Sequence, residues 1–407
     1  MAALRRTSVD IAGRFGGGVV SAVSPSRSGD ATAFVWSERE FPAWPRVGVV
    51  DDRGAIVLTR PEVRICGQPS WAASGELAVG GFVGVRRVVF DIGLAMGAVR
   101  HLAGGPAASY DLVEYVSAGV AVCRRRWLDG SVDLVRTRNG ADELLARERS
   151  GLPAWRDARL VSWRSGAFDL EGIFVPAAAA DPPWAVMVFL HGGPVASLAA
   201  GEAERVGAWA DPRFATFIPE FPASGICGEA AMLAAFEAAE LPEHDLEVDA
   251  VLAGIDSLVE SGLVHEQRLF LVGHSYGAYL VNRALTRTGR FRAAVCWEGV
   301  ADLRLLDKGN LAHQTRWRGG PPDETPERWS AASPIDRAER VCTPTLLYYG
   351  ADSGLVVQGR HWYEALRAAG VTTSLIVEDG VGHTFATDEG LGRFWELAVR
   401  WFREHLT

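Results

Sequence analysis

From about residue 160 onward, short and entirely apolar runs alternate with longer amphipathic stretches. Strands that are apolar at every position are buried on both faces, and the intervening helices cover them. The pattern therefore predicts a parallel sheet with helices on both sides. The expected strands contain residues 186–190, 216–218, 269–272, 293–296, 345–349 and 374–377, and the expected helices contain residues 246–261, 278–288, 362–369 and 391–405.

The first part of the chain has a different pattern. Residues 1 to about 157 carry short apolar runs bounded by Ser, Gly and Asp clusters, which is typical of β-strands. Similar strand starts recur near residues 24, 69 and 108, a spacing within the length range of a four-stranded propeller blade. Three blades would fit, although closed propellers usually need four or more. We expect a small, truncated propeller-like all-β domain over residues 1–157 and an α/β domain over residues 158–407, with a β-sandwich as the alternative for the first.

Composition and charge limit the partners and the cellular compartment that we expect for this chain. The chain has 407 residues and a net charge of -9, which suits two domains and argues against a nucleic-acid partner. Its five cysteines are odd in number and lack metal-like spacing, which favours free thiols in a reducing compartment and no metal site. The sequence has neither a signal peptide's apolar region nor a run long enough to span a bilayer. We expect a cytoplasmic protein without a membrane partner; a homo-oligomer is one option that composition leaves open.

One segment between an expected strand and an expected helix carries the pattern Gly-x-Ser-x-Gly. It reads Gly273-His274-Ser275-Tyr276-Gly277. A serine on such a turn adopts a strained backbone, and the two flanking glycines, Gly273 and Gly277, avoid the clashes that side chains would make. The helix N-terminus behind the serine favours developing negative charge. The segment predicts an α/β-hydrolase fold with Ser275 as nucleophile.

A serine hydroxyl needs a base, and in this fold the partners follow in the order Ser, Asp, His. Of the nine histidines, His383 is the one in a late, glycine-rich loop after a strand. Asp352 is the single carboxylate in the turn after residues 345–349, so it is the predicted acid that orients the imidazole. The alternative for Asp352 is a purely turn-forming role.

Hydrolysis also needs two donors for the oxyanion. The N–H of Tyr276, directly after the nucleophile, is one candidate. The second is the N–H of Gly193, in the segment His191-Gly192-Gly193-Pro194 that follows residues 186–190. Two adjacent glycines let the backbone approach a substrate carbonyl.

Residues 158–405 resemble the prolyl oligopeptidase family of serine peptidases, especially its acylaminoacyl-peptidase-like branch. The likeness is carried by residues 191–194, by the stretch from Asp249 to Ser275, and by Gly319-Gly320-Pro321-Pro322 with Trp329 and Ser333-Pro334-Ile335. The resemblance implies serine peptidase activity on short or acylated peptides, without metal or organic cofactor. Two segments depart from the family pattern. Residues 220–225 lack the usual arginine, and one residue instead of two separates Gly350 from Asp352.

Three functions follow from these residues. The first is cleavage of short or N-blocked peptides through a Ser-His-Asp triad and an acyl-enzyme, with a small peptide or acyl compound as substrate. The alternative is a carboxylesterase or acyltransferase acting on a small metabolite, because esters and amides share the tetrahedral intermediate and fold does not choose between them. The third is a binding protein with a degenerate site.

Overall fold

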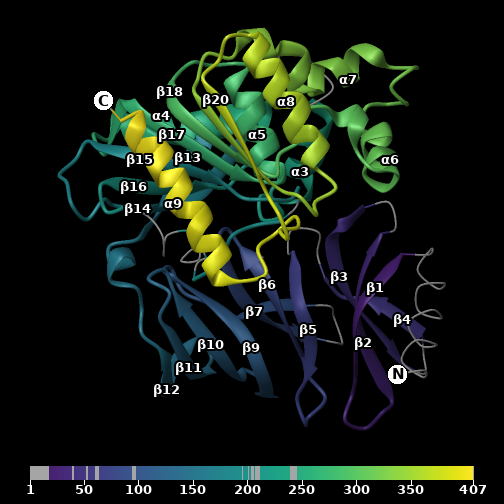
Figure 1. Cartoon of the computed structure of the whole chain (residues 1–407). Helices are drawn as coiled ribbons and strands as arrows, with labels where there is room; N and C mark the ends of the chain where they lie inside the picture. The colour runs from purple at the N-terminus through teal and green to yellow at the C-terminus, as the bar shows by residue number, and fades with distance from the viewer. Residues whose placement is uncertain are drawn as a thin grey trace. The chain divides into compact units, whose positions relative to one another are not determined.

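The structure is a computed structural model that describes residues 18–38, 41–51, 54–59, 64–93, 98–194, 196–199, 201–202, 206, 211–238 and 245–406. The chain divides into two compact units (Figure 1). The first comprises Met1–Arg156 and Leu198–Glu204, and the second comprises Asp157–Ser197 and Arg205–Thr407. The sequence placed a single boundary at residues 157 and 158 and did not predict that a short later segment would group with the first unit. Among the described residues, none of the helices has the length and apolar character needed to cross a membrane.

The described part of the first unit contains three four-stranded antiparallel sheets, each with its strands in chain order (Figure 1). The strands are β1 (Val19–Pro25), β2 (Ala31–Glu38), β3 (Phe41–Asp51) and β4 (Gly54–Val57) in the first sheet, β5 (Ile65–Trp71), β6 (Leu77–Val83), β7 (Arg86–Gly93) and β8 (Ala98–Ala103) in the second, and β9 (Ala108–Ser117), β10 (Val120–Trp127), β11 (Val132–Arg138) and β12 (Ala141–Arg149) in the third. The expected repeat of about one blade length is therefore a repeat of four-stranded sheets. The unit is propeller-like, with three blades in its described part.

Neighbouring sheets of the first unit share their cores. Val35 of β2 and Val79 of β6 belong to one buried cluster, which joins the first and second sheets. Val89 of β7 and Val135 of β11 belong to another, which joins the second and third. One blade alone cannot bury its apolar face, so stacking of successive blades supplies the burial.

The second unit is built on one eight-stranded sheet in the order β13-β14-β16-β15-β17-β18-β19-β20. Its strands are β13 (Arg159–Ser165), β14 (Phe168–Val175), β15 (Trp184–Leu190), β16 (Phe214–Pro219), β17 (Val264–His274), β18 (Phe291–Trp297), β19 (Thr345–Gly350) and β20 (Thr373–Glu378). The strands from β16 to β20 in this order are parallel, and β13 and β14 are an antiparallel edge. The predicted α/β-hydrolase architecture is confirmed.

Helices cover both faces of this sheet (Figure 1). They are α3 (Glu229–Ala238), α4 (Leu246–Glu260), α5 (Tyr276–Leu285), α6 (Lys308–Trp317), α7 (Pro326–Ala332), α8 (Val356–Ala368) and α9 (Asp388–Glu404). Phe214 of β16 packs against Phe402 of α9, whereas Phe217 lies next to Gly254 of α4. Successive strand residues point to opposite faces, so α9 and α4 lie on opposite sides of the sheet.

Candidate active site

Ser275 lies on a sharp turn between β17 and α5. Its φ of 55° and ψ of -116° are a conformation that residues with a side chain rarely adopt. A Cβ at Gly273 would lie 2.5 Å from the carbonyl carbon of Gly277, and one at Gly277 would lie 2.0 Å from the oxygen of Leu190. The Ser275 hydroxyl makes no capping hydrogen bond to α5. The surrounding backbone thus holds a strained serine with its hydroxyl available, an arrangement associated with functional sites.

His383 lies in the loop between β20 and α9 and faces this serine. Its Nε2 is 2.9 Å from Ser275 Oγ, although the two residues are 108 positions apart in the chain. The His383 side chain is 43% exposed. This distance is the one needed for an imidazole that takes a proton from a hydroxyl.

The carboxylate next to His383 is Glu298, and the prediction of Asp352 requires correction. Glu298 Oε2 lies 3.2 Å from His383 Nδ1, and the Glu298 side chain is fully buried. Asp352 is exposed, and its backbone N–H donates to the carbonyl oxygen of Val381 in the His383 loop. Asp352 therefore contributes its backbone to the packing of the two loops, while the carboxylate comes from the neighbouring strand.

Glu298 directly follows β18 and is held by the end of β19. Its φ of 56° is a further left-handed value in a residue that is not glycine. The N–H of Gly350 donates to Glu298 Oε1 at 2.6 Å, and the hydroxyl of Ser353 donates to Oε2. Ser353 is separated from Gly350 by two residues, which is the usual spacing of the acid in the family that the sequence resembles. A hydroxyl at that position now supports a carboxylate from the adjacent strand.

The sequence pattern did not point to Glu298, because the acid was expected in the turn after residues 345–349. A usable signal was present, since Glu298 is the first residue after β18, which is apolar at every position except Arg292. The carboxyl ends of parallel strands meet at one edge of the sheet, where the residues of such sites gather. Every carboxylate that directly follows a strand of the parallel set was therefore a candidate.

The two predicted oxyanion donors come from the start of α5 and from the loop after β15. Tyr276 is the first residue of α5, and N–H groups in the first turn of a helix have no acceptor within the helix. The loop after β15 passes next to the nucleophile, since a Cβ at Gly192 would lie 3.4 Å from Ser275 Cβ. The donor role of the Gly193 N–H, one residue further, stays a prediction.

A buried pair lies at the base of this loop. His191 Nε2 is 3.1 Å from Glu220 Oε2, and both side chains are almost completely buried. The His191 ring stacks on Phe221 with ring centroids 4.5 Å apart. These contacts join the end of β15 to the end of β16, and they occupy the segment in which the sequence lacks the family's arginine.

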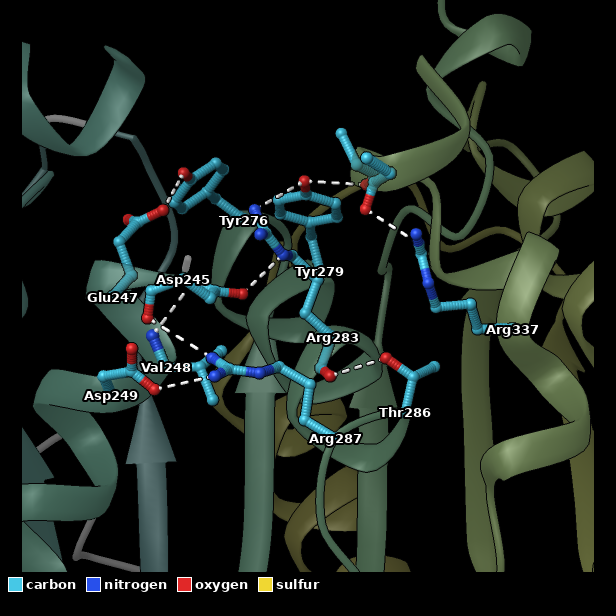
Figure 2. Close-up of polar contacts among 12 residues, drawn as sticks. Asp245, Glu247, Val248, Asp249, Tyr276, Tyr279, Arg283, Thr286, Arg287 and Arg337 are labelled. Carbon is cyan, nitrogen blue, oxygen red and sulfur yellow. Dashed lines mark hydrogen bonds and ion pairs between the residues drawn. The ribbon is translucent and has the colours of Figure 1, made fainter. Parts of the chain in front are cut away.

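A second polar cluster connects α5 to α4 (Figure 2). The Tyr276 hydroxyl donates to Glu247 Oε2 at 2.7 Å, and Arg283 pairs with Asp245 at 2.6 Å. Burial raises the pKa of Glu247 to about 7, and the nearby charge of Asp245 adds to this effect. The cluster anchors the side chain of Tyr276, whose backbone N–H is a predicted oxyanion donor.

The arrangement as a whole contains the parts of an acyl-transfer site. It has a hydroxyl on a strained turn, an imidazole at hydrogen-bond distance, a buried carboxylate behind the imidazole and free N–H groups at a helix start. In the described ranges, no group of three or more His, Cys, Asp or Glu side chains is arranged to hold a metal ion.

Sequence comparison finds similarity to known peptidases over part of the chain. Residues 235–407 match the prolyl oligopeptidase family. A probable chloroplastic glutamyl endopeptidase of Oryza sativa subsp. japonica is 24% identical over 165 residues, which cover 39% of this chain and 17% of that protein. This chain therefore matches only a part of that relative's length.

Solved structures share the fold of the chain. A puromycin-hydrolyzing peptidase of Mycobacterium tuberculosis is similar with a TM-score of 0.75 and 20% identity, covering 96% of this chain and 62% of that one. An acylaminoacyl peptidase of Pyrococcus horikoshii is similar with a TM-score of 0.77 and 16% identity, covering 96% of this chain and 63% of that one. The chain thus spans less than two thirds of either protein. The match to the prolyl oligopeptidase family covers residues 235–407, which contain Ser275, Glu298 and His383.

Proposed function

We propose that this protein is a serine hydrolase that cleaves short or N-blocked peptides through an acyl-enzyme on Ser275. His383 is the general base, and Glu298 is the acid that orients it. The observation that carries the proposal is the continuous hydrogen-bonded series from Ser275 Oγ through both nitrogens of His383 to Glu298 Oε2. It begins at a nucleophile whose backbone is strained and whose hydroxyl makes no capping hydrogen bond to α5.

The acylation step follows from this geometry. Ser275 Oγ attacks the substrate carbonyl carbon while His383 Nε2 takes the hydroxyl proton, and the carbonyl electrons move onto the oxygen. The N–H groups of Tyr276 and Gly193 donate to this oxyanion, and each such donor contributes about 10²–10³-fold in rate. The carbon–nitrogen bond then breaks as His383 passes its proton to the leaving amine.

Deacylation follows the same chemical steps, with water in place of the serine hydroxyl. His383 takes a proton from the water, and the acyl group leaves Ser275 as a carboxylic acid while the hydroxyl regains its proton. In both halves Glu298 Oε2 accepts a hydrogen bond from Nδ1–H of His383. That bond keeps Nε2 unprotonated in the resting imidazole and stabilises the imidazolium that forms in each transition state.

The substrate class is inferred from the family assignment together with the active-site chemistry. Two proteins with the same fold are described as an acylaminoacyl peptidase and a puromycin-hydrolyzing peptidase, which supports amides of acylated or single amino acids as the first compounds to test. The same machinery acts on esters. The buried His191 and Glu220 pair occupies a segment where the family often has an arginine, so contacts to the substrate can differ from those of the relatives.

The test is active-site labelling followed by a substrate panel. A fluorophosphonate probe is expected to label the folded wild-type protein and not the Ser275→Ala variant. The panel contains acetyl-alanine p-nitroanilide, dipeptidyl p-nitroanilides and p-nitrophenyl acetate. Turnover of the anilides supports the peptidase. Turnover of the ester alone would replace it by a carboxylesterase or acyltransferase, and failure of labelling in folded protein would point to a binding protein.

A further inference from the structure

His274 lies in the turn itself, between Gly273 and the nucleophile, as the last residue of β17. Its Nε2 is 3.0 Å from the backbone carbonyl oxygen of His383, 109 positions away in the chain. A carbonyl oxygen can only accept a hydrogen bond, so Nε2 of His274 must carry the proton. This side chain thus connects the nucleophile's turn directly to the backbone of the residue that faces the nucleophile.

Three other segments surround the His274 ring. The ring lies 3.9 Å, between centroids, from that of Trp297 at the end of β18, and 5.0 Å from the ring of His383. A Cβ at Gly192, in the loop after β15, would be 3.5 Å from His274 Nδ1. His274 is therefore packed against the Glu298-bearing strand end, the base's loop and the predicted oxyanion loop.

We propose that His274 is a positioning residue for His383, whose backbone it holds at the nucleophile's turn through its Nε2–H. The inference rests on the proposed function, because it assigns His274 a part in bringing His383 to Ser275. His274 does not contact the substrate in this scheme. It acts through the backbone of its neighbour.

The His383 loop is held at Val381 by the N–H of Asp352 and at Phe385 by ring contact with Trp297, and the bond from His274 is the contact at the backbone of His383 itself. Gly380 has a φ of 71°, and Gly382 has no heavy atom within 4 Å of where a Cβ would be. Glycines give the backbone more freedom than other residues, and the His383 side chain is 43% exposed. A displacement of about 1 Å at a catalytic group can cost about 10²-fold in rate. A hydrogen bond from the rigid strand end limits that displacement.

The imidazole of His274 also has to be uncharged when it donates this hydrogen bond. A positive charge on His274, with the rings 5.0 Å apart, would oppose the imidazolium that His383 becomes in each transition state. Burial lowers the pKa of His274 to about 4, and the charge of His383 lowers it further, while the hydrogen bond to the His383 carbonyl and the charge of Glu298 act in the other direction. Because the net effect is a lowered pKa, His274 is neutral at working pH. Its imidazole can therefore donate a hydrogen bond without adding charge.

Two substitutions separate this role from simple packing. His274→Phe keeps an aromatic ring next to Trp297 and removes the donor. His274→Gln restores an N–H at about the reach of Nε2. His361, exposed on α8, supplies the control variant His361→Phe. The measured quantities are the fluorophosphonate labelling rate, kcat and KM for p-nitrophenyl acetate, and Tm.

We expect His274→Phe to lower kcat and the labelling rate by about 10–100-fold with little change in KM. His274→Gln should recover most of that loss, and His361→Phe should behave as wild type. Equal rates for wild type and His274→Phe, or an equal loss in the Phe and Gln variants, would overturn the inference. Wild-type protein that is folded but neither labelled nor active would refute the proposed function instead.

A second measurement does not depend on the variants folding. Nitrogen-15 NMR of wild-type protein with labelled histidine is expected to show His274 as a neutral Nε2–H tautomer between pH 5.5 and 8. Protonation of its Nδ1 in the neutral ring, or titration of its imidazole above pH 6, would contradict the inferred hydrogen bond.

Discussion

Glu298→Gln is the substitution that tests the reassigned acid most directly. The change keeps the size of the side chain and replaces one carboxylate oxygen by an NH₂ group. The orientation of the new amide is dictated by Gly350, whose N–H donates to Oε1 at 2.6 Å. The amide oxygen has to remain opposite this donor, so the NH₂ group takes the place of Oε2, 3.2 Å from His383 Nδ1.

The consequence is a change of tautomer in His383. An NH₂ group is a donor, so Nδ1 must become an acceptor and the proton moves to Nε2. Nε2 is the atom that lies 2.9 Å from Ser275 Oγ, and once protonated it cannot accept the serine proton. An acid-to-amide change of this kind lowers kcat by roughly 10⁴-fold, which corresponds to about 5 kcal/mol of transition-state stabilisation.

The assay compares Glu298→Gln with Asp352→Asn. For each variant kcat for p-nitrophenyl acetate, or for whichever panel substrate the wild type turns over, is measured with the labelling rate and Tm. Asp352 is exposed, so its amide variant is expected to stay within about twofold of wild type, as surface substitutions usually do. An Asp352→Asn variant that loses activity next to an active Glu298→Gln variant would refute the reassignment.

Three further predictions concern the support of the site. Ser353→Ala removes a hydroxyl that donates to the Glu298 carboxylate, and denaturant titration should show a loss of about 1.5–3 kcal/mol in the free energy of unfolding. Glu247 has a pKa of about 7 in the fold, above its ordinary value of 4.5, so folding favours the neutral form and wild-type stability should fall as pH rises from 4.5 through 7. Glu247→Gln should lack this fall and be more stable than wild type at pH 8, by at most about 3 kcal/mol in chemical denaturation. Gly277→Ala places a Cβ 2.0 Å from a backbone oxygen and should lower the labelling rate by about 10²-fold or more, whereas Gly382→Ala, which meets no atom within 4 Å, should be tolerated.

Each of these predictions has a contradictory outcome. Unchanged stability in Ser353→Ala would mean that the hydroxyl does not support the carboxylate. Parallel pH–stability curves for wild type and Glu247→Gln would show that Glu247 does not titrate in the fold near neutral pH. Equal labelling of the two glycine variants would remove the steric argument for the turn.

Local signals along the chain were enough to predict the architecture. The fully apolar runs at residues 269–272 and 345–349 became β17 and β19, because a strand that is apolar on both faces is stable only inside a covered sheet. The spacing of strand starts in the first part likewise predicted its repeated four-stranded sheets. Both signals depend on residues that are close together in sequence. The grouping of Leu198–Glu204 with the first unit had no such signal.

What the sequence alone determined is the position of the nucleophile, because Gly273-His274-Ser275-Tyr276-Gly277 is a pattern of five consecutive residues. The clash that a Cβ at Gly273 would make lies within this turn, whereas the clash at Gly277 is with the backbone of Leu190 and depends on the fold. Only the tertiary structure decided which carboxylate stands behind His383. That choice depends on the register of β18 against β19, on the left-handed backbone at Glu298 and on the Ser353 hydroxyl that meets it. Several parallel strands end at the same edge of the sheet, and the reach of each side chain there is set by neighbours that are distant in sequence.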